Sequence, residues 1–122
     1  MKTLILGLLL IHQANAFAAF TVFRCTSATL QITKPMAYKD LIQYKNLSGN
    51  FPVESLSLQP FSYSRLTTYS FKRYYNEGDY LYNLVITPNA AEPKTGTAVL
   101  DRVNVYEGTR EILQPQMNCE LN

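Results

Sequence analysis

The residues that could do acid–base or nucleophilic chemistry are few in this sequence. The only histidine, His12, lies within the first sixteen residues, which we expect to be a signal peptide, and there are two cysteines, Cys25 and Cys119. A chain without an imidazole in its folded part has no ordinary general base near neutral pH. If the cysteines are bonded to each other, no thiolate remains for Cys–His catalysis or for a Cys/His zinc site. No P-loop, Rossmann glycine pattern, G-x-S-x-G or EF-hand loop is present, so we expect no cofactor and no metal site.

Carboxylate chemistry is the catalytic option that remains. A paired acid and base, as glycosidases use, could be drawn from five acidic residues: Glu77, Asp79, Asp101, Glu107 and Glu111. Most of them flank expected turns, where acidic side chains are ordinarily solvated. We therefore predict that the protein is not an enzyme, and a carboxylate-based hydrolase stays as an alternative.

Tyrosine is the most unusual feature of the composition, with nine residues and no tryptophan. Tyrosine offers a flat apolar ring with a polar tip and is favoured at binding interfaces. The candidate binding surface is a tyrosine cluster with two neighbouring cations: Tyr69, Tyr74, Tyr75, Tyr80, Tyr82, Lys72 and Arg73. The alternative is that these tyrosines are core and cross-strand packing residues of a β domain.

The first sixteen residues have the pattern of a secretory signal peptide. Lys2 is the positive region, residues 3–11 are the apolar region, and Ala14-Asn15-Ala16 is an A-x-A cleavage site, with Ala18 or Ala19 as alternatives. The apolar run is about half of the roughly 20 residues needed to span a bilayer. We therefore expect a signal peptide over residues 1–16, no membrane span, and a periplasmic or secreted protein.

The remaining residues, 17–122, have the size of one domain and carry nearly balanced charge. The whole chain has 11 Lys and Arg against 9 Asp and Glu, and removal of Lys2 lowers the formal charge from +2 to +1. No run of like charge is present, so the sequence predicts neither nucleic-acid binding nor a polybasic membrane patch.

The chain pattern favours β structure throughout this domain. Residues 17–25 read as a first strand, with Phe23 and Cys25 on one face, and Leu30 and Ile32 alternate with polar residues in a second. Residues 36–50 fit a short helix or a strand almost equally, and we favour a strand or irregular segment. Residues 53–58 alternate leucine with serine and predict a half-buried strand.

Two hairpins are expected in the C-terminal half. In the first, residues 66–75 pair with residues 79–87. In the second, residues 96–106 turn at Gly108, whose positive φ suits a tight loop, and residues 111–121 return. A three-residue loop over residues 107–109 would place the apolar residues of both strands on the same side of the sheet. On the first strand these are Val99, Val103 and Val105. On the return strand they are Leu113, Met117, Cys119 and Leu121. Pro115 predicts an edge or a bulge in the last strand.

These strands predict an all-β domain, a small antiparallel sandwich or alternatively a small barrel. Two cysteines in an exported chain most simply form one disulfide, here Cys25–Cys119, and two free thiols are the alternative. Such a bond requires Cα atoms within about 7 Å, which places the first and last strands side by side or on facing sheets. In the chain-entropy model, it contributes on the order of 4–5 kcal/mol.

This plan resembles that of small bacterial periplasmic proteins, including periplasmic inhibitors of lysozyme, in architecture alone. We accordingly expect a non-enzymatic envelope or secreted module that binds a protein or a glycan. The alternative is an inhibitor of a hydrolase that presents a rigid loop, either Asn76–Asp79 or Pro88–Gly96.

Overall fold

The computed structural model describes residues 20–50, 52–59, 67–75 and 78–122, and the side chains of residues 67, 74, 75 and 78 lie outside this description. The expected signal peptide and the start of the expected first strand therefore lie outside the described residues. Within the described ranges, no helix is long and apolar enough to cross a membrane.

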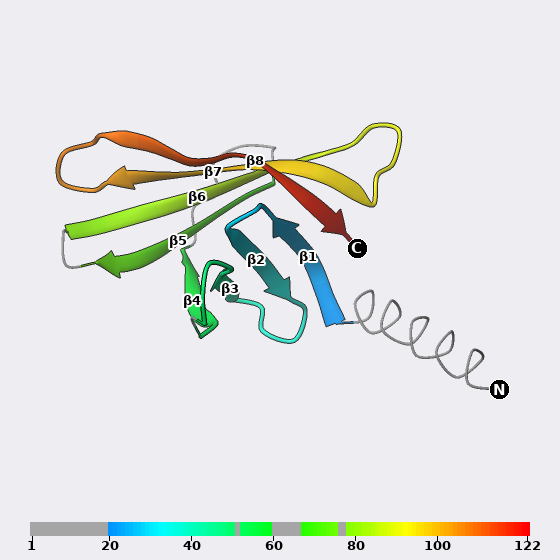
Figure 1. The fold of residues 1–122 in the computed structure, drawn as a ribbon, viewed down its shortest axis with the longest axis horizontal. Helices are drawn as coiled ribbons and strands as arrows, with labels where there is room; N and C mark the ends of the chain where they lie inside the picture. The colour runs from blue at the N-terminus through cyan, green and yellow to red at the C-terminus, as the bar shows by residue number, and fades with distance from the viewer. Residues whose placement is uncertain (1–19, 51, 60–66, 76–77) are drawn as a thin grey trace.

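The described chain consists of eight antiparallel strands that close into a barrel (Figure 1). Each strand pairs with the next one along the chain, and the last pairs with the first, which is the up-and-down order. The strands are β1 (Thr21–Thr26), β2 (Leu30–Pro35), β3 (Leu41–Asn46), β4 (Glu54–Gln59), β5 (Thr67–Tyr75), β6 (Gly78–Pro88), β7 (Thr95–Asn104) and β8 (Arg110–Leu121). The all-β prediction is confirmed, and of its two architectures the barrel is the observed one.

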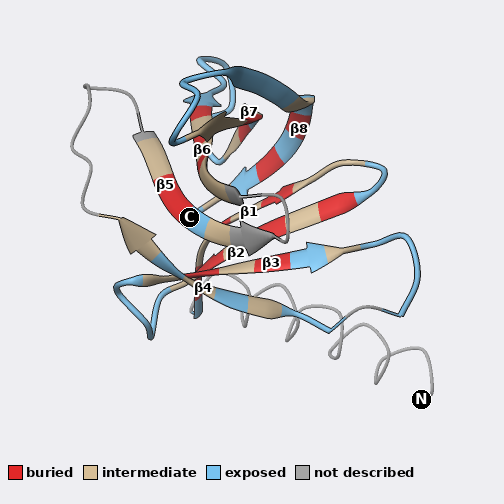
Figure 2. Ribbon diagram, turned by 90° about the vertical axis from the view of Figure 1, so that its left-hand side faces the viewer, coloured by how far each residue is buried: buried red, intermediate tan, exposed pale blue. Residues whose placement is uncertain are grey.

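Period-two alternation builds the core of the barrel. β1 and β2 both alternate buried and half-buried residues, and Figure 2 shows buried segments interrupted by more exposed ones along the strands. The buried apolar residues point inward from seven of the strands: Phe23, Cys25, Leu30, Ile32, Ile42, Tyr44, Phe71, Tyr82, Leu84, Ile86, Ala98, Leu100, Met117 and Cys119. The interior of an eight-stranded barrel is just wide enough for side chains to fill it.

The barrel is closed covalently where β1 meets β8. Cys25 and Cys119 face each other in the register of these two strands and form a disulfide with Cα atoms 4.0 Å apart. The predicted pairing is confirmed, and the two strands lie side by side. Cys25 is fully buried and Cys119 is 4% exposed, so the bond is part of the core.

The ambiguous segment over residues 36–50 contains a strand, β3, and the two predicted hairpins are β5–β6 and β7–β8. Gly108 has a φ of 71°, as its place in the turn predicted. Pro115 lies at a bulge: Ala98 pairs with Met117 and Leu100 with Gln114, so two steps along β7 match three along β8.

The prediction of which residues of the terminal hairpin point into the core is wrong for the first of its two strands. Ala98 and Leu100 point into the barrel from β7, whereas Val99 and Val103 pair with outward residues of β6 and Val105 is 51% exposed. On β8, Met117 and Cys119 are buried as expected, and Leu113 and Leu121 pack against the core. The loop between the strands has five residues, 105–109, in place of the expected three, and β8 is bulged. Both irregularities shift one strand's face relative to the other.

Candidate functional site

The described side chains of the predicted tyrosine surface lie on two sides of the barrel wall. Tyr69 and Tyr82 point inward: Tyr69 packs on Phe23 with ring centroids 4.7 Å apart, and Tyr82 is only 1% exposed. These two are packing residues, the alternative that the sequence left open. Lys72 is exposed. The strand backbone of Tyr74 and Tyr75 is described, but their side chains are not.

Arg73 lines a polar mouth at one end of the barrel. We use "the mouth" for a cavity of about 330 Å³, whose described lining residues come from several strands and loops: Thr29, Leu30, Tyr44, Asn46, Ser48, Arg73, Tyr82, Arg102, Leu113 and Gln114. Tyr80 lies beside it and stacks on Arg102, with the guanidinium carbon 4.2 Å from the ring centroid. The aliphatic core does not continue into the mouth. The inward-facing positions of β3, β5, β6 and β7 at this end of the barrel are occupied by polar or cationic residues.

Each arginine of the mouth stacks on an aromatic ring and pairs with a carboxylate. The guanidinium carbon of Arg73 lies 4.2 Å from the ring centroid of Tyr44, and Arg73 binds Glu54 through two bonds of 3.0 and 2.6 Å. Arg102 binds one oxygen of Glu111 at 2.9 and 2.8 Å. Burial lowers the pKa of both arginines, but their hydrogen bonds and carboxylate partners raise it by more, so both stay charged.

The tyrosines around the mouth form one aromatic cluster. Tyr82 stacks on Phe71 with centroids 5.3 Å apart, and Tyr44 meets both rings edge-on at 6.2 and 6.1 Å. Burial raises the pKa of the Tyr44 hydroxyl, and Arg73 partly opposes this. The floor of the mouth is therefore aromatic and neutral, and the charge of each arginine is balanced by its glutamate partner.

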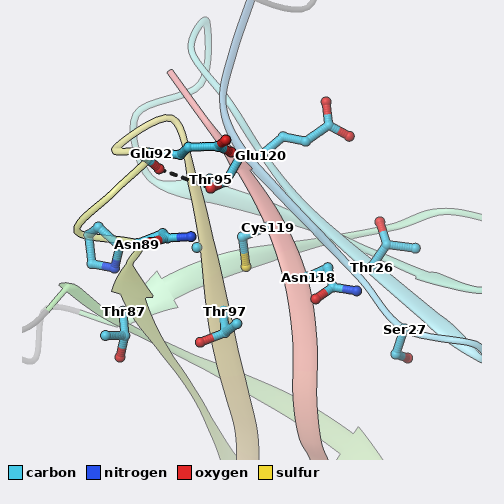
Figure 3. A pocket seen from close by; sticks show the side chains of 12 residues that line it. Thr26, Ser27, Thr87, Asn89, Glu92, Thr95, Thr97, Asn118, Cys119 and Glu120 are labelled. Carbon is cyan, nitrogen blue, oxygen red and sulfur yellow. Dashed lines mark hydrogen bonds between the residues drawn. The ribbon is translucent and has the colours of Figure 1, made fainter.

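A second concavity, "the groove", lies on the outside of the barrel where β6, β7, β8 and β1 run side by side (Figure 3). It measures about 830 Å³ and is lined mainly by hydroxyl, amide and carboxylate residues: Thr26, Ser27, Thr87, Pro88, Asn89, Glu92, Thr95, Gly96, Thr97, Asn118, Cys119 and Glu120. Strand register aligns four of them in one row, since Thr97 pairs with Thr87 on one side and with Asn118 on the other, and Asn118 pairs with Thr26.

The acidic residues named as catalytic candidates do not form a pair in the described structure. Asp101 is bound by Arg110, Glu111 by Arg102, and Asp79 accepts a bond of 3.2 Å from the Tyr106 hydroxyl. Glu107 is exposed, and Glu77 lies outside the described residues. The part of the chain that the structure describes also brings together no group of three metal-ligating side chains.

The sequence signals missed both concavities for the same reason. The mouth and the groove are each built by residues from strands far apart in the chain, and only the closure of the barrel brings them together. The alternation of polar residues along β7 and β8 can be read from the sequence, but the register in which these strands pair cannot.

No family model matches the chain, and no match was found among curated proteins or solved structures. The class that the fold defines is thus an eight-stranded up-and-down barrel with one disulfide across its closing seam.

Proposed function

We propose that this protein is an exported, non-enzymatic binding module and that its ligand is a glycan bound in the groove. A disulfide buried in the core supports export, because such bonds form and persist in oxidising compartments. The expected signal peptide over residues 1–16 points the same way, to the periplasm or the extracellular medium.

The observation that carries the proposal is the row Thr87–Thr97–Asn118–Thr26 across four strands. Neighbouring strands are about 4.8 Å apart, so the row presents hydroxyl and amide groups at regular intervals. Each of these groups can both donate and accept hydrogen bonds, as the hydroxyls of a sugar do. Thr87, Thr97 and Asn118 are exposed, so a ligand can reach them without a rearrangement of the groove.

Two carboxylates supply acceptors beside this row. Glu120 pairs with Thr95 in the strand register, and Glu92 accepts the Thr95 hydroxyl through its backbone carbonyl at 2.9 Å (Figure 3). A carboxylate accepts bonds from adjacent sugar hydroxyls without needing a proton of its own. Since the described lining holds no aromatic ring to stack on a sugar, we expect weak binding, with a Kd on the order of 1 mM per site.

The test is a titration of the purified, oxidised protein with a panel of neutral oligosaccharides, followed by NMR. The amides of β7 and β8 that border the groove should shift. Thr97→Val keeps the side-chain shape and removes the hydroxyl, and Asn118→Ala removes the amide; each should abolish the shifts. Ser55→Ala is the matched control, because Ser55 is an exposed hydroxyl residue on β4. Binding unchanged in both groove variants would refute the proposal, and release of shorter sugars would refute the non-enzymatic part.

A hydrolase inhibitor is the second candidate, and the β6–β7 loop favours it. This loop projects from the end of the barrel (Figure 1, yellow) and is held by its own bonds: Asn89 N–H to Thr95 O at 2.9 Å and Ala91 N–H to the Asn89 side chain at 3.0 Å. Leu121 N–H donates to Lys94 O at 2.7 Å, which ties the loop to β8. A pre-ordered exposed loop loses little entropy on binding.

The inhibitor alternative is tested by adding the protein to a panel of purified glycan and peptide hydrolases. Inhibition should disappear in Ala91→Arg, which enlarges an exposed loop residue, and persist in Asn118→Ala. No inhibition of any enzyme in the panel would leave the groove as the better-supported site.

A further inference from the structure

We infer that Asn46 is the attachment site of an N-linked glycan, added while the chain is exported. Asn46-Leu47-Ser48 is an N-x-S triplet, the acceptor sequence of N-glycosylation, and no other N-x-S or N-x-T triplet occurs in the chain. Such triplets also arise by chance, so the inference rests on how the fold presents this one.

The triplet lies where β3 ends and an exposed turn begins. Asn46 is the last residue of β3, and residues 47–50 are exposed, with Gly49 at a φ of 110°. The Leu47 N–H donates to Thr29 O at 2.8 Å, which holds this turn against the neighbouring turn after β1. A glycan is bulky and hydrophilic, so an acceptor asparagine must lie at the surface of the folded protein.

Ser48 holds the side chain of Asn46 in one orientation. The carbonyl oxygen Oδ1 of Asn46 accepts the Ser48 N–H at 3.2 Å and the Ser48 hydroxyl at 2.8 Å, which makes an Asx turn. The hydroxyl that completes the triplet therefore lies against the amide that would be modified. The amide nitrogen Nδ2 donates no bond to a described residue and is not among the buried unpaired atoms of the described chain, so it is open to solvent.

The mouth gives a glycan room at this position. Asn46 and Ser48 both line it, and Asn46 pairs in the strand register with Leu30, which also lines it. A sugar on Nδ2 would thus extend from the open end of the barrel and would displace no strand. The mouth and the groove share no described lining residue, so the glycan leaves the lining of the groove free.

The modification is a glycosyl transfer from a lipid-linked sugar diphosphate, catalysed by a transferase of the secretory compartment. Nδ2 forms a bond to the anomeric carbon of the first sugar and gives up one proton. The bond from that carbon to the diphosphate oxygen breaks, and the lipid diphosphate leaves with the electron pair. A chain reaches this enzyme only during export, which the disulfide and the expected signal peptide both support.

The experiment is translation of the full chain, with its own leader, in the presence of endoplasmic-reticulum microsomes. We expect the protease-protected chain to gain one glycan that peptide-N-glycosidase removes. Asn46→Gln and Ser48→Ala should each abolish the gain, and Ser48→Thr, which keeps the hydroxyl, should retain it. Asn50→Gln is the matched control, because it changes an exposed asparagine of the same turn that belongs to no acceptor triplet.

Mass spectrometry of the chain secreted by a eukaryotic host locates the glycan. The glycosidase converts the modified asparagine to aspartate, so the mass change should fall on the peptide that contains residue 46. A chain that does not enter the microsomes, a protected chain without a glycan, or a glycan retained in Asn46→Gln or Ser48→Ala would each overturn the inference. Neutral-sugar binding in the groove can be measured on Asn46→Gln, so either proposal can fail without the other.

Discussion

At the scale of single residues, the most deeply buried charged side chain among the described residues is that of Asp101. It is 3% exposed and accepts two bonds from Arg110, at 3.0 and 2.6 Å, and one from Asn83 at 3.1 Å. Asn83 in turn accepts the Ser70 hydroxyl at 2.7 Å. Strand register places Ser70, Asn83 and Asp101 in one row on the outward side of the wall. Every oxygen of this carboxylate therefore has a partner.

Replacement of Asp101 by asparagine should destabilise the fold by about 2–4 kcal/mol, because an amide group would face the Arg110 donors and the buried row would lose its charge-assisted bonds. The measurement is the urea midpoint of unfolding. Glu107→Gln makes the same chemical change at an exposed turn residue and should stay within about 0.5 kcal/mol. A similar small effect in both variants would show that the row of Ser70, Asn83 and Asp101 contributes nothing to the stability of the fold.

Tyr69 should make stability fall at alkaline pH. Burial raises the pKa of its hydroxyl above the ordinary 10.0. As pH rises, the unfolded chain loses this proton first and the native state holds more protons, so stability decreases. The contribution is fully present below about pH 10 and is lost as pH passes the folded pKa. Urea unfolding from pH 8 to 11 should show a shallower decline in Tyr69→Phe, and parallel curves for variant and wild type would contradict this.

At the scale of elements, local sequence pattern was enough to find both hairpins and most of the strands, but it left the segment that contains β3 ambiguous. Phe23 with Cys25, and Tyr82 with Leu84 and Ile86, share a buried face as period-two alternation predicts. The face of β7 could not be found this way, because bulges in β8 and the length of a loop are set by backbone bonds that leave little trace in composition. Asn104 orders that loop by accepting the Tyr106 and Glu107 N–H groups at 3.0 and 3.1 Å.

Two glycines should respond differently to alanine. A Cβ at Gly96 would lie 2.7 Å from the backbone oxygen of Thr87, so β6 and β7 must separate, and we expect a loss of about 2–3 kcal/mol. At Gly108, nothing lies within 4 Å, and only the positive φ of 71° resists a side chain, at about 1 kcal/mol. Thermal unfolding of both variants measures the two losses of stability. Gly108→Asn should recover part of its loss, and equal losses at the two positions would contradict the ranking.

At the scale of the whole molecule, neither concavity could be predicted from the sequence. The sequence assigned Arg73 to the tyrosine surface and did not single out Arg102, because their common cavity depends on which strands are neighbours around the closed wall. Tyr44 lay in the segment whose secondary structure was ambiguous. Closure of a sheet is a global property, whereas propensity and periodicity are local ones.

The barrel wall is uneven, and β4 should be its first strand to open. Among the described residues, β4 pairs with β5 at two positions only, Leu58 with Phe71 and Gln59 with Ser70, and no residue of β4 is buried. β6 and β7 pair at nine positions. We expect the amides of β4 to exchange with deuterium well before those of β6 and β7, since local opening follows contact density. Equal protection in both regions would rule this out.

The disulfide at the closing seam makes the wall one continuous covalent ring. The chain between Cys25 and Cys119, 94 positions apart, runs once round the barrel, and the sulfur bridge joins its ends. A protease that cuts any one connection between the strands, such as the exposed β6–β7 loop, therefore leaves a single molecule. Such a nicked protein should migrate as one species until it is reduced, and only then separate into two fragments.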